Sequence, residues 1–86
     1  MVESNITDLK LVNTLYSIYY IQKDEYIGKK LKSYTGKEVF SKIEHCEKFL
    51  IKNGFSKCEN IKYDMVMKVG SVTTYSIIKE INLYEY

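Results

Sequence analysis

The sequence predicts a small α+β fold in which two β-hairpins form an antiparallel sheet and one α-helix packs on one face of it (ββαββ). Three observations lead to this fold: a tyrosine-rich stretch with strand character at 14–34, an amphipathic pattern at 36–53, and alternating segments after residue 60. The chain has 86 residues, which fits a single domain over 1–86. For residues 1–13 three alternatives stay open: a flexible segment, a short helix or an extension of the first strand.

The first hairpin is expected from strands at 14–22 and 26–34. The segment TLYSIYYI is rich in aromatic and β-branched residues, which fit a pleated sheet better than a helix. The following QKDE is expected to form the turn between the two strands. A tight turn around Lys23-Asp24 would place Ile18 and Tyr20 on the side that the helix covers.

The helix, expected at about 36–53, has the clearest signature. Thr35 and Glu38 stand three residues apart, as in a capping box, where each side chain satisfies a backbone donor of the first turn. Asn53-Gly54 follows the last turn, and glycine suits the left-handed position that ends many helices. The apolar residues that recur at helical spacing are Val39, Ile43, Cys46 and Leu50.

The second hairpin is expected from strands at 61–69 and 72–84. Apolar and polar residues alternate over the first of these segments, as in a half-buried strand. The second segment is long, and its alternation slips near 78–80, which predicts a β-bulge there.

Two registers can be compared for this hairpin. A three-residue loop at 68–70 would pair Tyr63 with Tyr75 and keep the apolar residues on one face. A tight turn at Gly70-Ser71 would instead place Tyr75 opposite polar residues. We therefore expect the three-residue loop.

Composition limits the kinds of partner. The net charge is only +2, and all thirteen basic residues are lysines. Without arginine, the surface lacks the planar fork that suits phosphate and guanine recognition. No apolar run is long enough to span a bilayer, and the first twenty residues lack the pattern of a secretory signal, so a cytoplasmic protein with reduced cysteines is expected.

Motifs for catalysis or metal binding are not found. His45 is the only histidine, and its neighbour Cys46 points about 100° away on a helix, so the two cannot readily share a metal or act as base and nucleophile. Adding Cys58 would still leave a structural zinc site one ligand short. The carboxylates are interspersed with lysines, as on a solvated surface. We therefore expect no enzyme activity, cofactor or metal.

Tyrosines and lysines on the sheet face that the helix leaves uncovered form the predicted contact surface. Tyrosine supplies a large, rigid contact area with a polar tip, which suits a protein interface. The residues expected to bind a partner are Tyr19, Tyr26, Lys30, Lys32 and Tyr34, extended by Lys62 and Lys68.

The sequence thus predicts a non-enzymatic protein that binds another protein. Small size, a codon bias typical of AT-rich genomes and missing catalytic groups suit an inhibitor from a phage or mobile element that acts against a host machine. Anti-CRISPR proteins are an analogy of type, not a sequence match. Two functional alternatives stay open: a regulator that stacks single-stranded nucleic acid on its tyrosines, and an accessory subunit that dimerises through a free sheet edge. Cross-strand tyrosine pairing that only stabilises a thin domain is the structural alternative.

Overall fold

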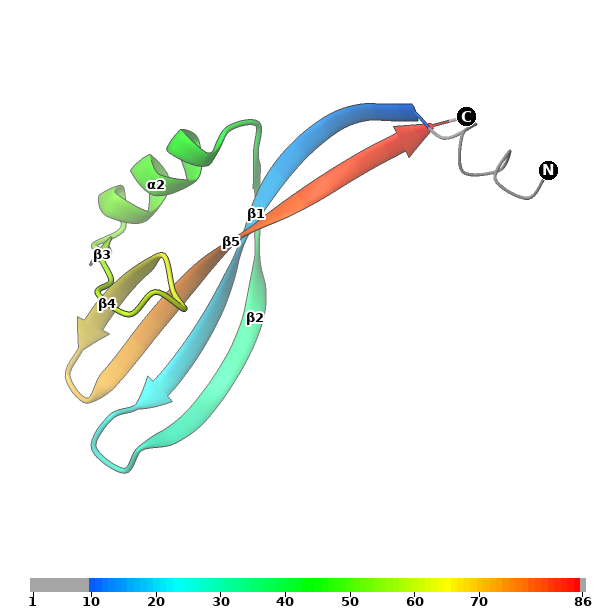
Figure 1. Cartoon of the computed structure of the whole chain (residues 1–86). Coiled ribbons are helices and arrows are strands. Elements are labelled where there is room, and N and C mark those ends of the chain that lie inside the picture. Colours follow the sequence, from blue (N-terminus) through cyan, green and yellow to red (C-terminus); the bar gives the residue numbers. More distant parts are fainter. Residues whose placement is uncertain (1–9, 86) are drawn as a thin grey trace.

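The computed structural model describes residues 10–85 as one antiparallel sheet with a helix beside it (Figure 1). The strands lie in the order β2-β1-β5-β4-β3. The elements are β1 (Lys10–Asp24), β2 (Lys29–Phe40), α2 (Ile43–Lys52), β3 (Ser56–Lys57), β4 (Met65–Val69) and β5 (Val72–Glu85). The predicted α+β class with an antiparallel sheet is confirmed. The ββαββ order holds only roughly, because β3 adds a fifth strand.

The two longest strands, β1 and β5, pair with each other from Asp24–Val72 to Lys10–Glu85. β2 accompanies β1 only as far as the pair Tyr16–Phe40. Beyond that point Lys10–Leu15 of β1 and Ile81–Glu85 of β5 form a two-stranded ribbon, which we call the arm. Figure 1 shows the arm projecting from the body of the protein.

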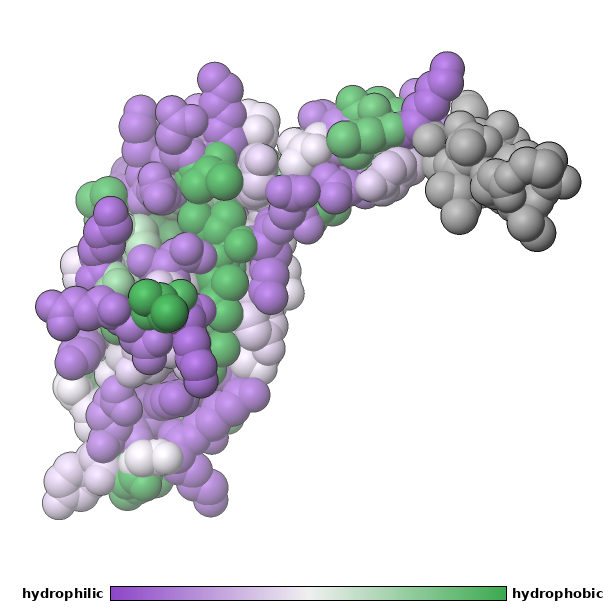
Figure 2. All heavy atoms as spheres, viewed as in Figure 1, coloured by the Kyte–Doolittle hydropathy of each residue, from purple (hydrophilic) through white to green (hydrophobic). Residues whose placement is uncertain are grey.

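The arm gives the molecule an elongated shape. Its Cα radius of gyration is 16.7 Å and its longest dimension is 56 Å. A compact domain of this length has a radius of gyration of about 12 Å. The arm also exposes apolar side chains, and Figure 2 shows a hydrophobic cluster on it among hydrophilic residues.

The core lies between α2 and one face of the sheet, which we call the helix-side face. Paired residues on neighbouring strands point to the same face, so the register assigns every strand residue to this face or to the opposite one, the open face. The core side chains, each at most 8% exposed, are Ile18, Tyr20, Cys46, Leu50, Phe55 and Met65.

The helix is shorter than predicted, since it begins at Ile43 rather than near residue 36. Residues 35–40 belong to β2, in which Thr35, Val39 and Phe40 pair with β1, and the ring of Phe40 packs on that of Phe49 with 5.3 Å between centroids. The Thr35–Glu38 capping box is therefore wrong. Lys42 occupies the N-cap position, and its side chain makes no capping hydrogen bond.

The predicted end of the helix is confirmed. Gly54 has a φ of 92°, the left-handed conformation that glycine adopts without steric cost. Its N–H donates to the carbonyl of Ile51 at 3.1 Å, and the N–H of Phe55 donates to that of Leu50 at 3.0 Å. This is a Schellman motif, and it directs Phe55 into the core.

The first hairpin is confirmed, but its register differs from the prediction. The turn lies at 25–28 rather than around Lys23-Asp24, and Tyr20 pairs with Tyr34. Lys32 and Tyr34 therefore lie on the helix-side face and not on the open face. Of residues 1–13, only 10–13 are described, and they extend the first strand; the remainder of that prediction lies outside the described residues.

The second hairpin corrects the other register prediction. Val69 pairs with Val72 across a two-residue Gly70-Ser71 turn, and Tyr75 lies opposite Val66. The three-residue loop was expected because it would keep the apolar residues of the hairpin on one face. Both faces of β5 carry apolar residues, so this criterion does not distinguish the two registers. The first strand is also shorter than predicted, because β4 begins only at Met65. The bulge expected at 78–80 is not present there; the shift between β1 and β5 lies between Leu11 and Asn13 instead.

Candidate protein interface

The open face of the sheet carries a band of apolar side chains that the pair Ser17–Lys79 interrupts. Tyr19 lies opposite Ile77, and Ile21 opposite Tyr75, on the central strands. Leu15 and Ile81 extend the band toward the arm, and Val66 extends it across β4. These side chains are half-buried by their neighbours within the sheet, and no described helix covers them. The band is therefore available to another molecule as far as residues 10–85 show.

Lysines lie at one end of this band and within it. Lys30, Lys23 and Lys68 follow one another across β2, β1 and β4 on the open face, because Lys23 pairs with Lys30 and both Lys23 and Lys68 pair with Thr73. Lys79 pairs with Ser17 and lies within the band, between Ile77 and Ile81 on β5. The open face thus combines apolar side chains with positive charges.

The tyrosine rings of the open face already have partners within the chain. The Nζ atom of Lys79 lies 5.8 Å from the ring centroid of Tyr19, and that of Lys23 lies 5.5 Å from the centroid of Tyr75. Tyr63 stacks on Tyr75 with 4.3 Å between centroids. Such cation–π and stacking contacts fix the rings and leave less of their faces free for a nucleic-acid base.

Tyr75 is also held by the first hairpin. Its hydroxyl donates to Oε2 of Glu25 at 2.9 Å. This hydrogen bond favours the neutral phenol and, with burial and the negative charge of Glu25, raises the pKa of Tyr75 to about 12. The hydroxyl therefore stays protonated at neutral pH and acts as a donor.

The predicted site residues do not form one surface. Tyr19, Lys30 and Lys68 lie on the open face. Tyr34 and Lys32 lie together on the helix-side face, with Lys32 Nζ 5.3 Å from the ring centroid of Tyr34. The last two lie apart from both groups, Tyr26 in the first hairpin turn and Lys62 in the loop between β3 and β4.

Several open-face residues were missed by the sequence reasoning. Lys23, Tyr75, Ile77 and Lys79 enter the site only because β1 pairs with β5. Each hairpin taken by itself does not indicate which residues of β1 and β5 share a face. The period-two alternation of apolar and polar residues indicates which residues of one strand share a face. It does not indicate which strand lies beside it.

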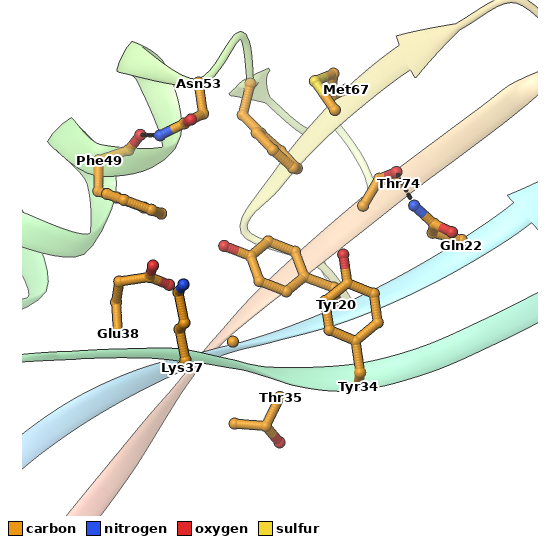
Figure 3. Close-up of a pocket in the computed structure, with 12 residues that line it drawn as sticks. Tyr20, Gln22, Tyr34, Thr35, Lys37, Glu38, Phe49, Asn53, Met67 and Thr74 are labelled. Atoms are coloured by element: carbon orange, nitrogen blue, oxygen red, sulfur yellow. Dashed lines mark hydrogen bonds between the residues drawn. The ribbon is translucent and has the colours of Figure 1, made fainter.

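The helix-side face has a groove of about 510 Å³ between β2 and the C-terminal part of α2. Figure 3 shows the ring of Tyr20 lying in this groove, with its hydroxyl directed toward the side of Phe49 and Glu38. Burial, followed by the charge of Glu38, raises the pKa of Tyr20, so this phenol cannot serve as a base at neutral pH. The aromatic side chains that line the groove are Tyr20, Tyr34, Phe49 and Phe55.

Two hydrogen bonds occupy polar groups at the margins of this groove. The side-chain amide of Asn53 donates to the carbonyl of Phe49 at 2.7 Å, and that of Gln22 donates to the hydroxyl of Thr74 at 3.3 Å (Figure 3). Both amides are committed to the fold, so the groove is a mainly apolar extension of the core.

Groups with metal-binding or nucleophilic chemistry are dispersed. His45 is exposed on α2, while Cys46 is fully buried and Cys58 half-buried, and both thiols are free. Among residues 10–85, no group of three or more His, Cys, Asp and Glu residues could hold a metal ion. The same residues include no helix with the length and apolar character that a membrane crossing needs.

Comparison with known proteins finds no matching family model, no matching curated protein and no matching solved structure. The geometry of this chain is therefore the basis for a functional proposal.

Proposed function

We propose that this chain is a protein-binding module and that its partner docks on the open face of the sheet. The observation that carries the proposal is the apolar band along β1 and β5 on the face opposite α2. A partly exposed apolar band with charged residues beside it is typical of a protein-interaction site. The lysines select a partner with apolar residues and acidic residues beside them.

The arrangement of the tyrosines favours a protein partner over single-stranded nucleic acid. Stacking on bases requires free ring faces, whereas Lys79, Lys23 and Tyr63 contact the rings of Tyr19 and Tyr75. Rings fixed in this way offer rigid contact area at low entropic cost, which is the property that makes tyrosine frequent at protein interfaces.

Site-specific photo-crosslinking in the source cell tests the proposal. Tyr34 and Thr35 are adjacent exposed residues of β2, and their side chains point to the helix-side face and the open face, respectively. A photoreactive amino acid at Thr35 should cross-link a defined protein. The same group at Tyr34 serves as the matched control and should give that product weakly or not at all.

A second measurement separates protein from nucleic acid. Nuclease treatment and physiological salt should leave the Thr35 product intact, because lysine–phosphate binding falls steeply with salt and apolar contacts do not. The proposal is wrong if both positions cross-link the same protein equally, or if the Thr35 product disappears on nuclease treatment.

A further inference from the structure

The arm is a two-stranded ribbon, and no third strand among residues 10–85 pairs with it. Isolated two-stranded ribbons are marginal in water and become stable when further strands or a helix join them. Leu11, Val12, Leu83 and Tyr84 are 43–56% exposed along the arm. The arm therefore has both the apolar area and the free backbone groups to take up another strand.

The free edges of the sheet differ in how well they could accept a strand. The edge strand β2 carries Lys29, Lys30, Lys32 and Lys37, and lysines on an edge oppose pairing with another chain. The β1 edge of the arm is interrupted by the register shift next to Val12. The outer edge of β5 is regular, and β4 accompanies it only as far as Ser76.

Hydrogen bonds in the body show which groups of β5 face this outer edge. The N–H of Ile78 donates to Oδ2 of Asp64 at 2.6 Å, and the carbonyl of Ser76 accepts from the N–H of Asp64 at 2.8 Å. Because these groups alternate sides along an antiparallel strand, even-numbered residues direct both groups outward. Glu80, Asn82 and Tyr84 therefore direct backbone donors and acceptors to this edge of the arm, where no strand of the described part of the chain pairs with them.

We propose that two copies of this chain join by antiparallel pairing of these outer β5 edges, with Asn82 opposite Asn82 of the second copy. A two-fold axis at this residue makes the contact self-complementary. It places Glu80 opposite Tyr84 of the second copy and Ile81 opposite Leu83 of the second copy. The even-numbered residues then form the hydrogen-bonded pairs, and both arms become part of a four-stranded sheet.

Charge selects this register over its neighbours. With the axis at Asn82, Lys79 lies opposite Glu85 of the second copy, and symmetry forms this ion pair twice. Moving the axis to Ile81 places Lys79 opposite Leu83, and moving it to Leu83 places Ile81 opposite Glu85. Opposite-charge cross-strand pairs stabilise a sheet, whereas a charge opposite an apolar residue gains no such attraction.

This dimer is distinct from the proposed partner surface, with which it shares only Lys79 and Ile81 at the end nearest the arm. It uses the backbone edge of the arm and leaves the open face of each body uncovered. A two-fold axis perpendicular to the sheet keeps both open faces on the same side, so the dimer would present two partner sites in one direction.

Charge reversal tests the register directly in the full chain. Lys79→Glu alone creates two carboxylate–carboxylate pairs in the dimer, and Glu85→Lys alone creates two ammonium–ammonium pairs. Sedimentation equilibrium should show a concentration-dependent dimer for the unmodified chain and a dissociation constant about tenfold higher for each variant. An equimolar mixture of the two variants should dimerise as tightly as the unmodified chain, because each position 79 then meets an opposite charge at position 85.

Asn82→Pro tests the edge itself. It removes an outward N–H and no backbone hydrogen bond to β1, and proline is tolerated on edge strands. It also removes the side-chain oxygen of Asn82, which accepts from the hydroxyl of Thr14 on β1 at 3.1 Å. The dimer should be lost while the far-ultraviolet circular dichroism of the sheet is retained. The inference is overturned if the unmodified chain is a monomer at every concentration, if Asn82→Pro still dimerises, or if mixing the charge variants gives no tighter dimer than either alone.

Discussion

Gly36 approaches the ring of Tyr20 so closely that a Cβ atom on Gly36 would lie 2.9 Å from Cε2 of the tyrosine. The register of β1 and β2 shifts at this point, with Gly36 between the pairs Tyr19–Thr35 and Ser17–Val39. Tyr20 also packs against Tyr34 and Phe55, with ring centroids 5.2 Å and 5.9 Å away. The glycine thus makes room for the aromatic centre of the core.

We predict that Gly36→Ala lowers the free energy of unfolding by about 1–3 kcal/mol, because the added methyl group overpacks the core. Gly36 does not have a positive φ, so alanine meets no backbone strain there. Urea denaturation measures the effect. In a Tyr20→Val background, which removes the ring, the same substitution should cost less than about 0.5 kcal/mol. Equal costs in both backgrounds would contradict the steric explanation.

The structure explains which parts of the fold could be predicted from sequence. The end of α2 depends on local chemistry, since Asn53 and Gly54 form a C-cap in many sequence contexts. Its start does not: Thr35 and Glu38 match a capping box, yet pairing of β2 with β1 takes these residues into a strand. A long-range strand partner therefore overrides a local helix signal.

The candidate site could be predicted only in outline, for a related reason. An uncovered sheet face follows from one helix beside one sheet, and the sequence indicates both. Which side chains lie on that face depends on turn position and register, and a shift of one residue moves a side chain to the other face. The register shift between the pairs Lys23–Lys30 and Gln22–Lys32 is what placed Tyr34 on the helix-side face beside Tyr20.

The two faces of α2 provide a second prediction. Leu50 is fully buried against the sheet, whereas its neighbour Ile51 is 59% exposed. Leu50→Ala should lower the free energy of unfolding by about 2–5 kcal/mol, because it removes buried contacts and leaves a cavity. Ile51→Ala is the matched control on the same turn and should change it by less than about 1 kcal/mol. Thermal or urea denaturation measures the loss of unfolding free energy in each variant. Similar losses in the two variants would contradict the described packing.

The two thiols should differ in reactivity. Burial raises the pKa of the Cys46 thiol, and no part of Cys46 is exposed to solvent, so little reactive thiolate forms and reagents cannot reach it. Cys58 is partly exposed. Brief alkylation of the native protein, followed by mass spectrometry, should modify Cys58 and spare Cys46, and unfolding in urea should make both react. Equal modification of the two thiols in the native protein would contradict the burial of Cys46.

The hydrogen bond from Tyr75 to Glu25 gives the protein a predictable sensitivity to alkaline pH. Folding raises the pKa of Tyr75 from about 10 to about 12, so the folded state holds this proton more tightly than the unfolded state. The stabilisation is fully present below pH 10 and is lost as the pH rises through 12. Tyr75→Phe cannot ionise, so the free-energy advantage of the unmodified protein over this variant should shrink between these pH values.

Glu25→Gln keeps an acceptor but removes the charge, and nuclear magnetic resonance of the labelled Tyr75 ring should then show a lower pKa. An advantage that stays constant over the interval, or a Tyr75 pKa unchanged by Glu25→Gln, would show that this contact does not control the titration.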